Sequence, residues 1–159
     1  MITDLQHVFS DAQAITADAV GTNVIDLGVD RDIGNGEPMC VLFSVDVAAD
    51  QTTGDEDYTF DVEYASDAAQ TTGRKLIGRA VFESGTPTAP AQDADLLVPG
   101  YKFMIQIPAA ALSVSERFLG IRYDVTGTTP TITMTAILMP QSMAETGYAT
   151  YPKGYTITG

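Results

Sequence analysis

The sequence is poor in the residues that build metal sites, disulfides and nucleophile sites. Its 159 residues include one cysteine (Cys40), one histidine (His7) and no tryptophan. A lone cysteine excludes an internal disulfide, and a single histidine far from it argues against zinc and nucleophile–histidine sites. No segment approaches the roughly 20 apolar residues of a membrane-spanning helix. The N-terminal residues Met1 to Asp4 lack the basic and apolar regions of a secretory leader, so we expect none. We therefore expect a protein made in the cytoplasm that does not interact with membranes.

Basic residues are also scarce. The chain has 8 Lys and Arg against 21 Asp and Glu, a formal net charge of −13 and a pI near 4.1. Nucleic-acid binding needs clustered cations to neutralise phosphates, so nucleic acid is excluded as a partner. Hydrophobic residues make up 45% of the chain, which argues against disorder. The length suits one domain with a sizeable core.

The main pattern in the sequence is the alternation of apolar and polar residues. The longest such stretch is 117–139, where two nine-residue arms flank the turn 126–130. In the second arm Ile132, Met134 and Ala136 share one face and threonines occupy the other, which is the period of a half-buried strand. We predict a hairpin whose two apolar faces contact one core.

Shorter stretches of the same kind recur along the chain. Counted with the two arms, they predict about eight strands, the others at 23–27, 39–47, 58–65, 74–83, 96–98 and 101–108. Gly- and Pro-rich loops separate them, and no long helix is predicted. This pattern is typical of an antiparallel β-sandwich, either a jelly roll or an immunoglobulin-like fold. The strand count favours the jelly roll, over residues 23–140, with an extended N-terminal arm (1–22) and a C-terminal arm or tail (141–159).

Candidate catalytic and metal-binding groups are few. The acidic loop Asp50–Asp57 is either a solvated charge run or a weak calcium site, and its spacing is not that of an EF-hand. Asp61 and Glu63 lie two positions apart on the outer face of a predicted strand, without a partner across a cleft. Cys40 lies in an apolar strand and is expected to be a buried, inert thiol. We expect no enzymatic activity, no cofactor and no bound metal.

The last 19 residues contain three tyrosines, Tyr148, Tyr151 and Tyr155. Tyrosine is enriched at interfaces because it combines a large contact area with a polar tip. These side chains either dock on another chain or fold back on their own domain. They are also the one candidate platform for stacking a sugar.

Three N-terminal segments resemble a known family. They read FSDAQAIT at 9–16, TNVIDLG at 22–28 and RDIGNGEP at 31–38. In order and spacing they resemble the Bbp16-type capsid cement proteins of tailed bacteriophages. The resemblance implies a jelly-roll subunit that oligomerises on the outer capsid surface of the virion and clamps neighbouring major capsid proteins. It carries over no enzymatic residues.

The resemblance also suggests where contacts would lie. The expected capsid-contact residues are Phe9, Ser10, Asp11, Gln13, Arg31, Asp32 and Glu37. Phe9 could instead plug the end of the sandwich, and Arg31 and Asp32 could serve only to pin their loop. The implied partners are the major capsid protein and further copies of the chain. A dimer is favoured over a trimer because two-fold interfaces are the commonest. The alternative function is a glycan- or host-surface-binding module on the virion.

Overall fold

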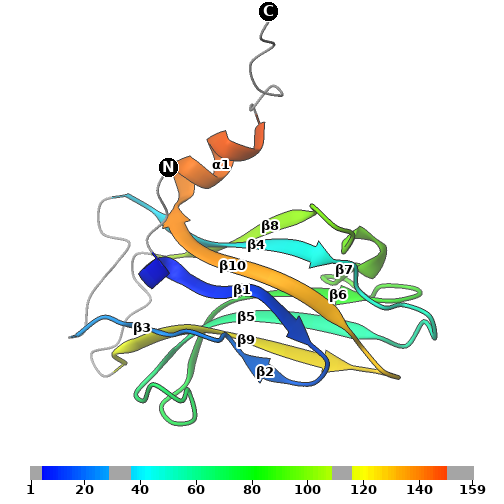
Figure 1. Ribbon diagram of the computed structural model, residues 1–159, viewed down its shortest axis with the longest axis horizontal. Coiled ribbons are helices and arrows are strands. Elements are labelled where there is room, and N and C mark those ends of the chain that lie inside the picture. Colours follow the sequence, from blue (N-terminus) through cyan, green and yellow to red (C-terminus); the bar gives the residue numbers. More distant parts are fainter. Residues whose placement is uncertain (1–4, 29–36, 109–115, 150–159) are drawn as a thin grey trace, which may run out of the picture.

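The computed structural model describes residues 5–28, 37–108 and 116–149, and they form a two-layer β-sandwich (Figure 1). A 3₁₀ turn, η1, begins the described chain and one short α-helix, α1, ends it (Figure 1). The elements are η1 (Leu5–His7), β1 (Val8–Ile15), β2 (Ala19–Val20), β3 (Ile25–Asp26), β4 (Met39–Val47), β5 (Asp57–Ala65), β6 (Lys75–Glu83), β7 (Gln92–Asp93), η2 (Ala94–Leu96), β8 (Lys102–Ile107), β9 (Phe118–Thr126), β10 (Ile132–Pro140) and α1 (Gln141–Ala149).

The strand pairing is that of a jelly roll. One sheet has the order β1-β10-β4-β8, and the other has the order β2-β9-β5-β6-β7, with β3 also on β9. The first strand therefore pairs with the last, β2 and β3 with β9, β4 with β8, and β5 with β6, all antiparallel. Such nested pairing is a long hairpin wound into two layers, as a jelly roll requires. The predicted all-β sandwich is confirmed.

The predicted pairing of the 117–139 stretch is wrong. Its two arms, β9 and β10, lie in opposite sheets: β9 pairs with β5, and β10 pairs with β1 and β4. The connection between them crosses the roughly 10 Å that separates packed sheets. The predicted faces are nevertheless right, because Leu119, Ile121, Ile132 and Met134 are all buried in the one core. Periodicity therefore gave the buried faces and not the partner strands.

Aromatic side chains fill the space between the sheets. Phe43 and Phe103 stack with ring centroids 5.0 Å apart, and Phe60 meets both of them edge-on or tilted. Tyr123 lies perpendicular to Phe60 at 5.9 Å. Offset and edge-to-face packing of this kind stabilises beyond area burial alone. The inward side chains predicted for β5, Tyr58, Phe60, Val62 and Tyr64, are all buried.

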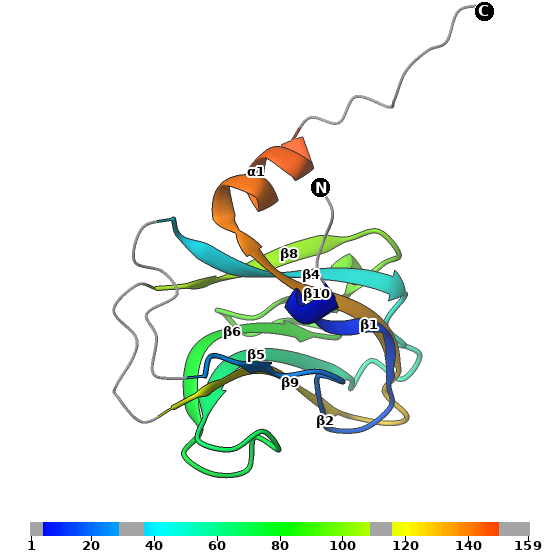
Figure 2. The ribbon, with the colours of Figure 1, turned by 60° about the vertical axis from the view of Figure 1, so that its left-hand side comes forward.

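Helix α1 covers one end of the outer face of the four-stranded sheet, as Figure 2 shows. There Ala144 packs with Cys40 and Met139 in a small second cluster. Burial raises the pKa of the Cys40 thiol to about 11, with a smaller contribution from the Glu145 charge. Cys40 is the buried thiol that the sequence predicted. The prediction of an extended tail from residue 141 is wrong for 141–149, which are helical.

The predicted N-terminal arm is largely part of the sandwich. Residues 8–15 form β1, an edge strand paired with β10, and 19–20 form β2 on β9. Register shifts flank Ser10, and Ala12 has a φ of 46°, so the strand carries irregularities of the β-bulge type. A bulge breaks the period-two pattern, which is why the sequence did not reveal this strand. The predicted strand at 96–98 is instead the end of η2 and a turn, with Leu97 buried.

Candidate partner-binding surface

Two of the predicted contact residues lie inside the sandwich. Phe9 and Ser10 are fully buried. The hydroxyl of Tyr123 donates to Ser10 Oγ at 3.0 Å, and Ser10 Oγ donates to Gln13 Oε1 at 2.7 Å. Burial raises the pKa of Tyr123 well above its usual range, the hydrogen bond with Ser10 partly opposes this, and the charge of Asp46 adds a smaller increase. In this structure Phe9 and Ser10 therefore hold the two layers together and offer no surface to a partner.

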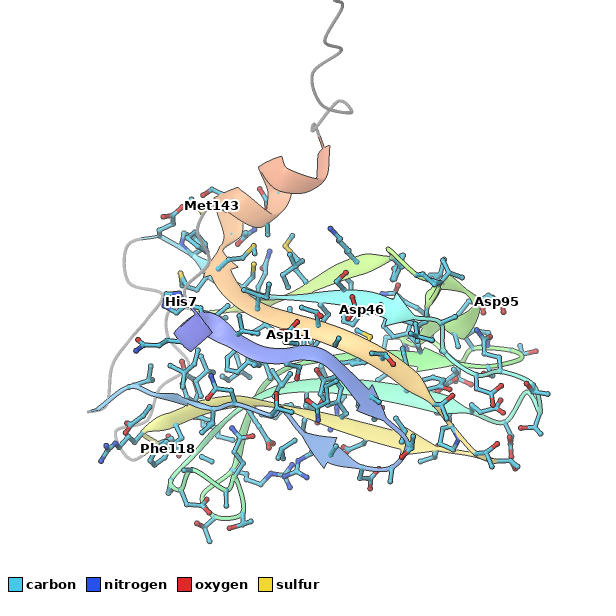
Figure 3. The ribbon with its side chains drawn as sticks, viewed as in Figure 1. His7, Asp11, Asp46, Asp95, Phe118 and Met143 are labelled. Carbon is cyan, nitrogen blue, oxygen red and sulfur yellow. The ribbon has the colours of Figure 1, made fainter. Side chains whose placement is uncertain are left out.

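Of the other two predicted contact residues on β1, Gln13 makes hydrogen bonds within the chain and Asp11 is exposed. Gln13 Nε2 donates to the carbonyl of Val20 at 2.9 Å, and its Oε1 accepts from the backbone N–H of Thr22 at 3.1 Å. Gln13 thus ties β1 to the chain that leads through β2. Asp11 is exposed and lies on β1 (Figure 3). Of the four predicted contact residues on β1, Asp11 is the exposed one.

The free edge of β1 is partly covered by the chain itself. The carbonyl of Phe9 accepts from the N–H of Asn23 at 2.9 Å and from Thr22 Oγ1 at 3.1 Å, and Asn23 Nδ2 donates to the carbonyl of Val8 at 3.0 Å. Paired edges do not invite strand addition. A shallow hollow beside them is lined by Asp11, Thr22 and Asn23, among others. A partner at this edge would therefore contact side chains and would not add a strand to the sheet.

Glu37 lies at the end of the sandwich where α1 begins. Its carboxylate accepts a short hydrogen bond from Ser142 Oγ, and the N–H of Gln141 donates to the carbonyl of Pro38 at 2.8 Å. These bonds fix the first turn of α1 to the residues before β4. Glu37 is itself exposed. The predicted residues Arg31 and Asp32 lie outside the described part of the chain.

The structure describes the position of one of the three tyrosines predicted for the tail. Tyr148 lies in the last turn of α1. Tyr151 and Tyr155 lie outside the described residues. Their role in contacts with another chain stays a prediction.

A charge network on the outer face of the six-stranded sheet was not predicted. Asp61 is bound by Arg79 Nε and Nη2 at 2.7 and 2.6 Å. Glu63 accepts from Arg74 at 2.8–3.0 Å and from Arg122 at 3.2 Å. The sequence placed Asp61 and Glu63 on this outer face, but both are only 2% exposed, because arginine side chains cover them. Arg79 on β6, Arg122 on β9 and Arg74 just before β6 were the available signal.

The same network affects Asp124. Burial raises the pKa of the Asp124 carboxyl, and the like charges of Asp61 and Asp18 add to the effect. Arg122 and Arg74 act in the opposite direction and are weaker. This face therefore carries a network of paired charges, in which the Asp124 carboxyl protonates more readily than usual.

The carboxylates of the acidic loop accept hydrogen bonds from nearby backbone and threonine groups. Glu56 is fully buried and accepts from the N–H groups of Thr53 and Gly54 at 3.1 and 2.9 Å, as well as from Thr53 Oγ1. Asp55 accepts from the N–H and hydroxyl of Thr128 at 3.2 and 3.0 Å. These bonds keep the pKa values of both carboxyls below their usual range, with Thr53 the first cause. Within residues 5–28, 37–108 and 116–149, no cluster of three or more His, Cys, Asp or Glu is arranged to hold a metal ion.

Comparison with known proteins gives the chain a family. The model of the Bbp16 family matches residues 9–138, which run from β1 to β10. The chain belongs to the Bbp16 family. The family name is phage-derived, so the Bbp16 chain is a phage-related β-sandwich protein. A search of curated proteins finds no match. No helix of the described Bbp16 chain is long and apolar enough to cross a membrane.

Proposed function

We propose that this Bbp16 protein is a capsid cement protein, which binds the outside of an assembled phage shell and clamps neighbouring major capsid proteins. The observation that carries the proposal is the family match over residues 9–138. That span includes all or nearly all of every strand in both sheets, so the likeness extends over the folded domain and not to one motif.

The physical properties of the chain suit such a role. A jelly roll tied by paired sheets and a continuous core is a rigid clamp. A net charge of −13 repels packaged nucleic acid and suits the outer face of the shell. A protein that binds only the assembled lattice stabilises it by mass action. Repetition over a symmetric shell strengthens modest contacts through avidity.

The proposed partners are the major capsid protein and a second copy of the chain. A dimer is favoured over a trimer, because a two-fold axis is the commonest way to pair identical surfaces. Exposed residues at the predicted contact segments, Asp11 on β1 and Glu37 beside α1, are the proposed capsid contacts.

Cosedimentation with purified shells that lack this protein tests the proposal. Wild-type protein is expected to pellet with the shells in a fixed stoichiometry, and Asp11→Ala is expected to weaken binding. Thr16→Ala is the matched control, since Thr16 is an exposed side chain just beyond the same strand. Wild-type protein that stays in the supernatant would sink the cement function, and a glycan array would then test the module alternative.

A further inference from the structure

Exposed apolar side chains gather at the end of the sandwich away from α1. Val47 is 58% exposed, Val98 51% and Leu96 41%. They are three of the six large hydrophobic residues that are exposed in the described part of the chain. We call these three residues the η2 patch. Contiguous exposed apolar surface on a folded domain marks an interaction site more often than isolated side chains do.

Backbone hydrogen bonds bring the three residues together. The chain 45–49 runs antiparallel to 97–101: the N–H of Val45 donates to the carbonyl of Tyr101 at 2.9 Å, and the N–H of Ala49 donates to that of Leu97 at 3.0 Å. Val47 therefore lies across from the turn that holds Val98. The N–H of Val98 donates to the carbonyl of Leu96 at 2.8 Å, which keeps Leu96 beside it.

The buried neighbours show that the patch is built on fixed structure. Leu97 and Ala94 are fully buried and join the main core. Gln51 Nε2 donates to the carbonyl of Ala94 at 2.7 Å, which anchors η2 to the loop after β4. The exposed side chains of the η2 patch therefore belong to a segment that its buried residues and hydrogen bonds hold in place. A pre-ordered surface loses less entropy when a partner binds.

Carboxylates surround the patch. Asp46 and Asp50 flank it on the β4 side, Asp93 is the N-cap residue of η2, and Asp95 lies within η2. Figure 3 labels Asp95 at this end of the molecule and Asp46 on β4, nearer the middle. No lysine or arginine occurs in residues 44–57 or 91–101, and the next basic residue is Lys102 at the start of β8. Apolar contact area is therefore rimmed by negative charge.

We propose that the η2 patch is a docking surface for a capsid-protein surface that presents an apolar side chain flanked by lysine or arginine. The inference rests on the proposed cement function and names the face of the clamp. Charge complementarity selects this occupant, since a basic rim on the partner meets the four carboxylates. A second copy paired through the same patch does not fit, because the carboxylates of the two copies would then face one another.

Shell binding by surface variants tests the docking surface. The patch variant carries Val47→Ser and Val98→Ser, and the control variant carries Leu76→Ser and Met104→Ser, which replace exposed side chains (49% and 37%) elsewhere. Substitutions of exposed side chains cost little stability, and equal melting temperatures would verify this. The probe is the purified shell lacking this protein, titrated at two salt concentrations.

The patch variant is expected to bind shells at least about tenfold more weakly, which is about 1.4 kcal/mol, and the control variant is expected to bind like wild type. Wild-type affinity should also fall with added salt, and Asp95→Asn should reduce that dependence. If wild type binds and the patch variant binds equally well, the docking surface is refuted while the cement function stands. If wild type does not bind at all, both are refuted.

Discussion

Replacing Gly120 with alanine tests how the loop 66–73 is seated on the sandwich. Gly120 lies on the outer face of β9, opposite Glu63 of β5. A Cβ atom at this position would lie 1.6 Å from Gln70 Nε2 and 2.3 Å from Gln70 Cδ. Gln70 is only 2% exposed, so its side chain is buried against the sandwich. Alanine at position 120 must therefore displace the buried side-chain amide of Gln70.

The expected cost is that of an overpacked site, about 2 kcal/mol within a usual range of roughly 1–3 kcal/mol. In a domain of this size, roughly 2–4 °C of melting temperature correspond to 1 kcal/mol. Gly120→Ala should therefore lower the melting temperature by roughly 4–8 °C. Displacement of Gln70 also threatens the hydrogen bond from Arg122 Nη2 to its carbonyl, which is 3.1 Å long.

A second substitution separates this cause from a general loss of stability. Gln70 has a φ of 54°, a conformation that glycine adopts without strain, and its side-chain amide has no hydrogen-bond partner among the described residues. Gln70→Gly in the Gly120→Ala background should therefore restore most of the lost stability, with a coupling energy above about 1 kcal/mol. Thermal unfolding followed by circular dichroism measures both. A single variant as stable as wild type, or a double variant no better than the single one, would refute the reasoning.

Three further outcomes follow from the same structure. The Cys40 thiol, with its pKa raised to about 11, should resist a thiol reagent at pH 8 while the chain is folded and react once it is unfolded; equal rates in both states would contradict its burial. Hydrogen bonds from Thr71 and Thr72 lower the pKa of Asp67 from 3.8 to about 2, so its support of the loop should be complete above the unfolded pKa and disappear as pH falls through about 2. An NMR titration midpoint near 4 for Asp67 would show that those bonds are absent in solution. Glu63→Gln should cost about 1–3 kcal/mol in urea unfolding, because the carboxylate accepts hydrogen bonds from both Arg74 and Arg122; an unchanged midpoint would mean that the network contributes nothing.

Strands with regular alternation could be predicted from the sequence closely. The predicted strand 39–47 has the bounds of β4, and 58–65 differs from β5 by one residue. In β1, bulges around Ser10 and the left-handed Ala12 scramble the alternation, so its strand could not be recognised. The separation of β9 and β10 into two sheets was equally hidden, because alternation reports the buried face and carries no information on the neighbouring strand.

The candidate site was predictable only in part, because similarity of segments does not say which side chains face outward. Phe9 and Ser10 lie in a matched segment yet are buried. Asp11, the next residue of the same segment, is exposed. The burial of Asp61 and Glu63 depends on arginines up to 59 positions away in the chain. The η2 patch likewise arises from hydrogen bonds between segments about 50 residues apart, which no local pattern encodes.

The central claim is that this protein stabilises an assembled shell, and the melting of the shell tests it most directly. Shells lacking the protein are heated with and without a saturating amount of it, and their disruption is followed by light scattering. A cement protein binds the intact lattice and not its dispersed subunits, so the account predicts a higher disruption temperature with the protein present. Shells that bind the protein and yet melt at an unchanged temperature would contradict the account.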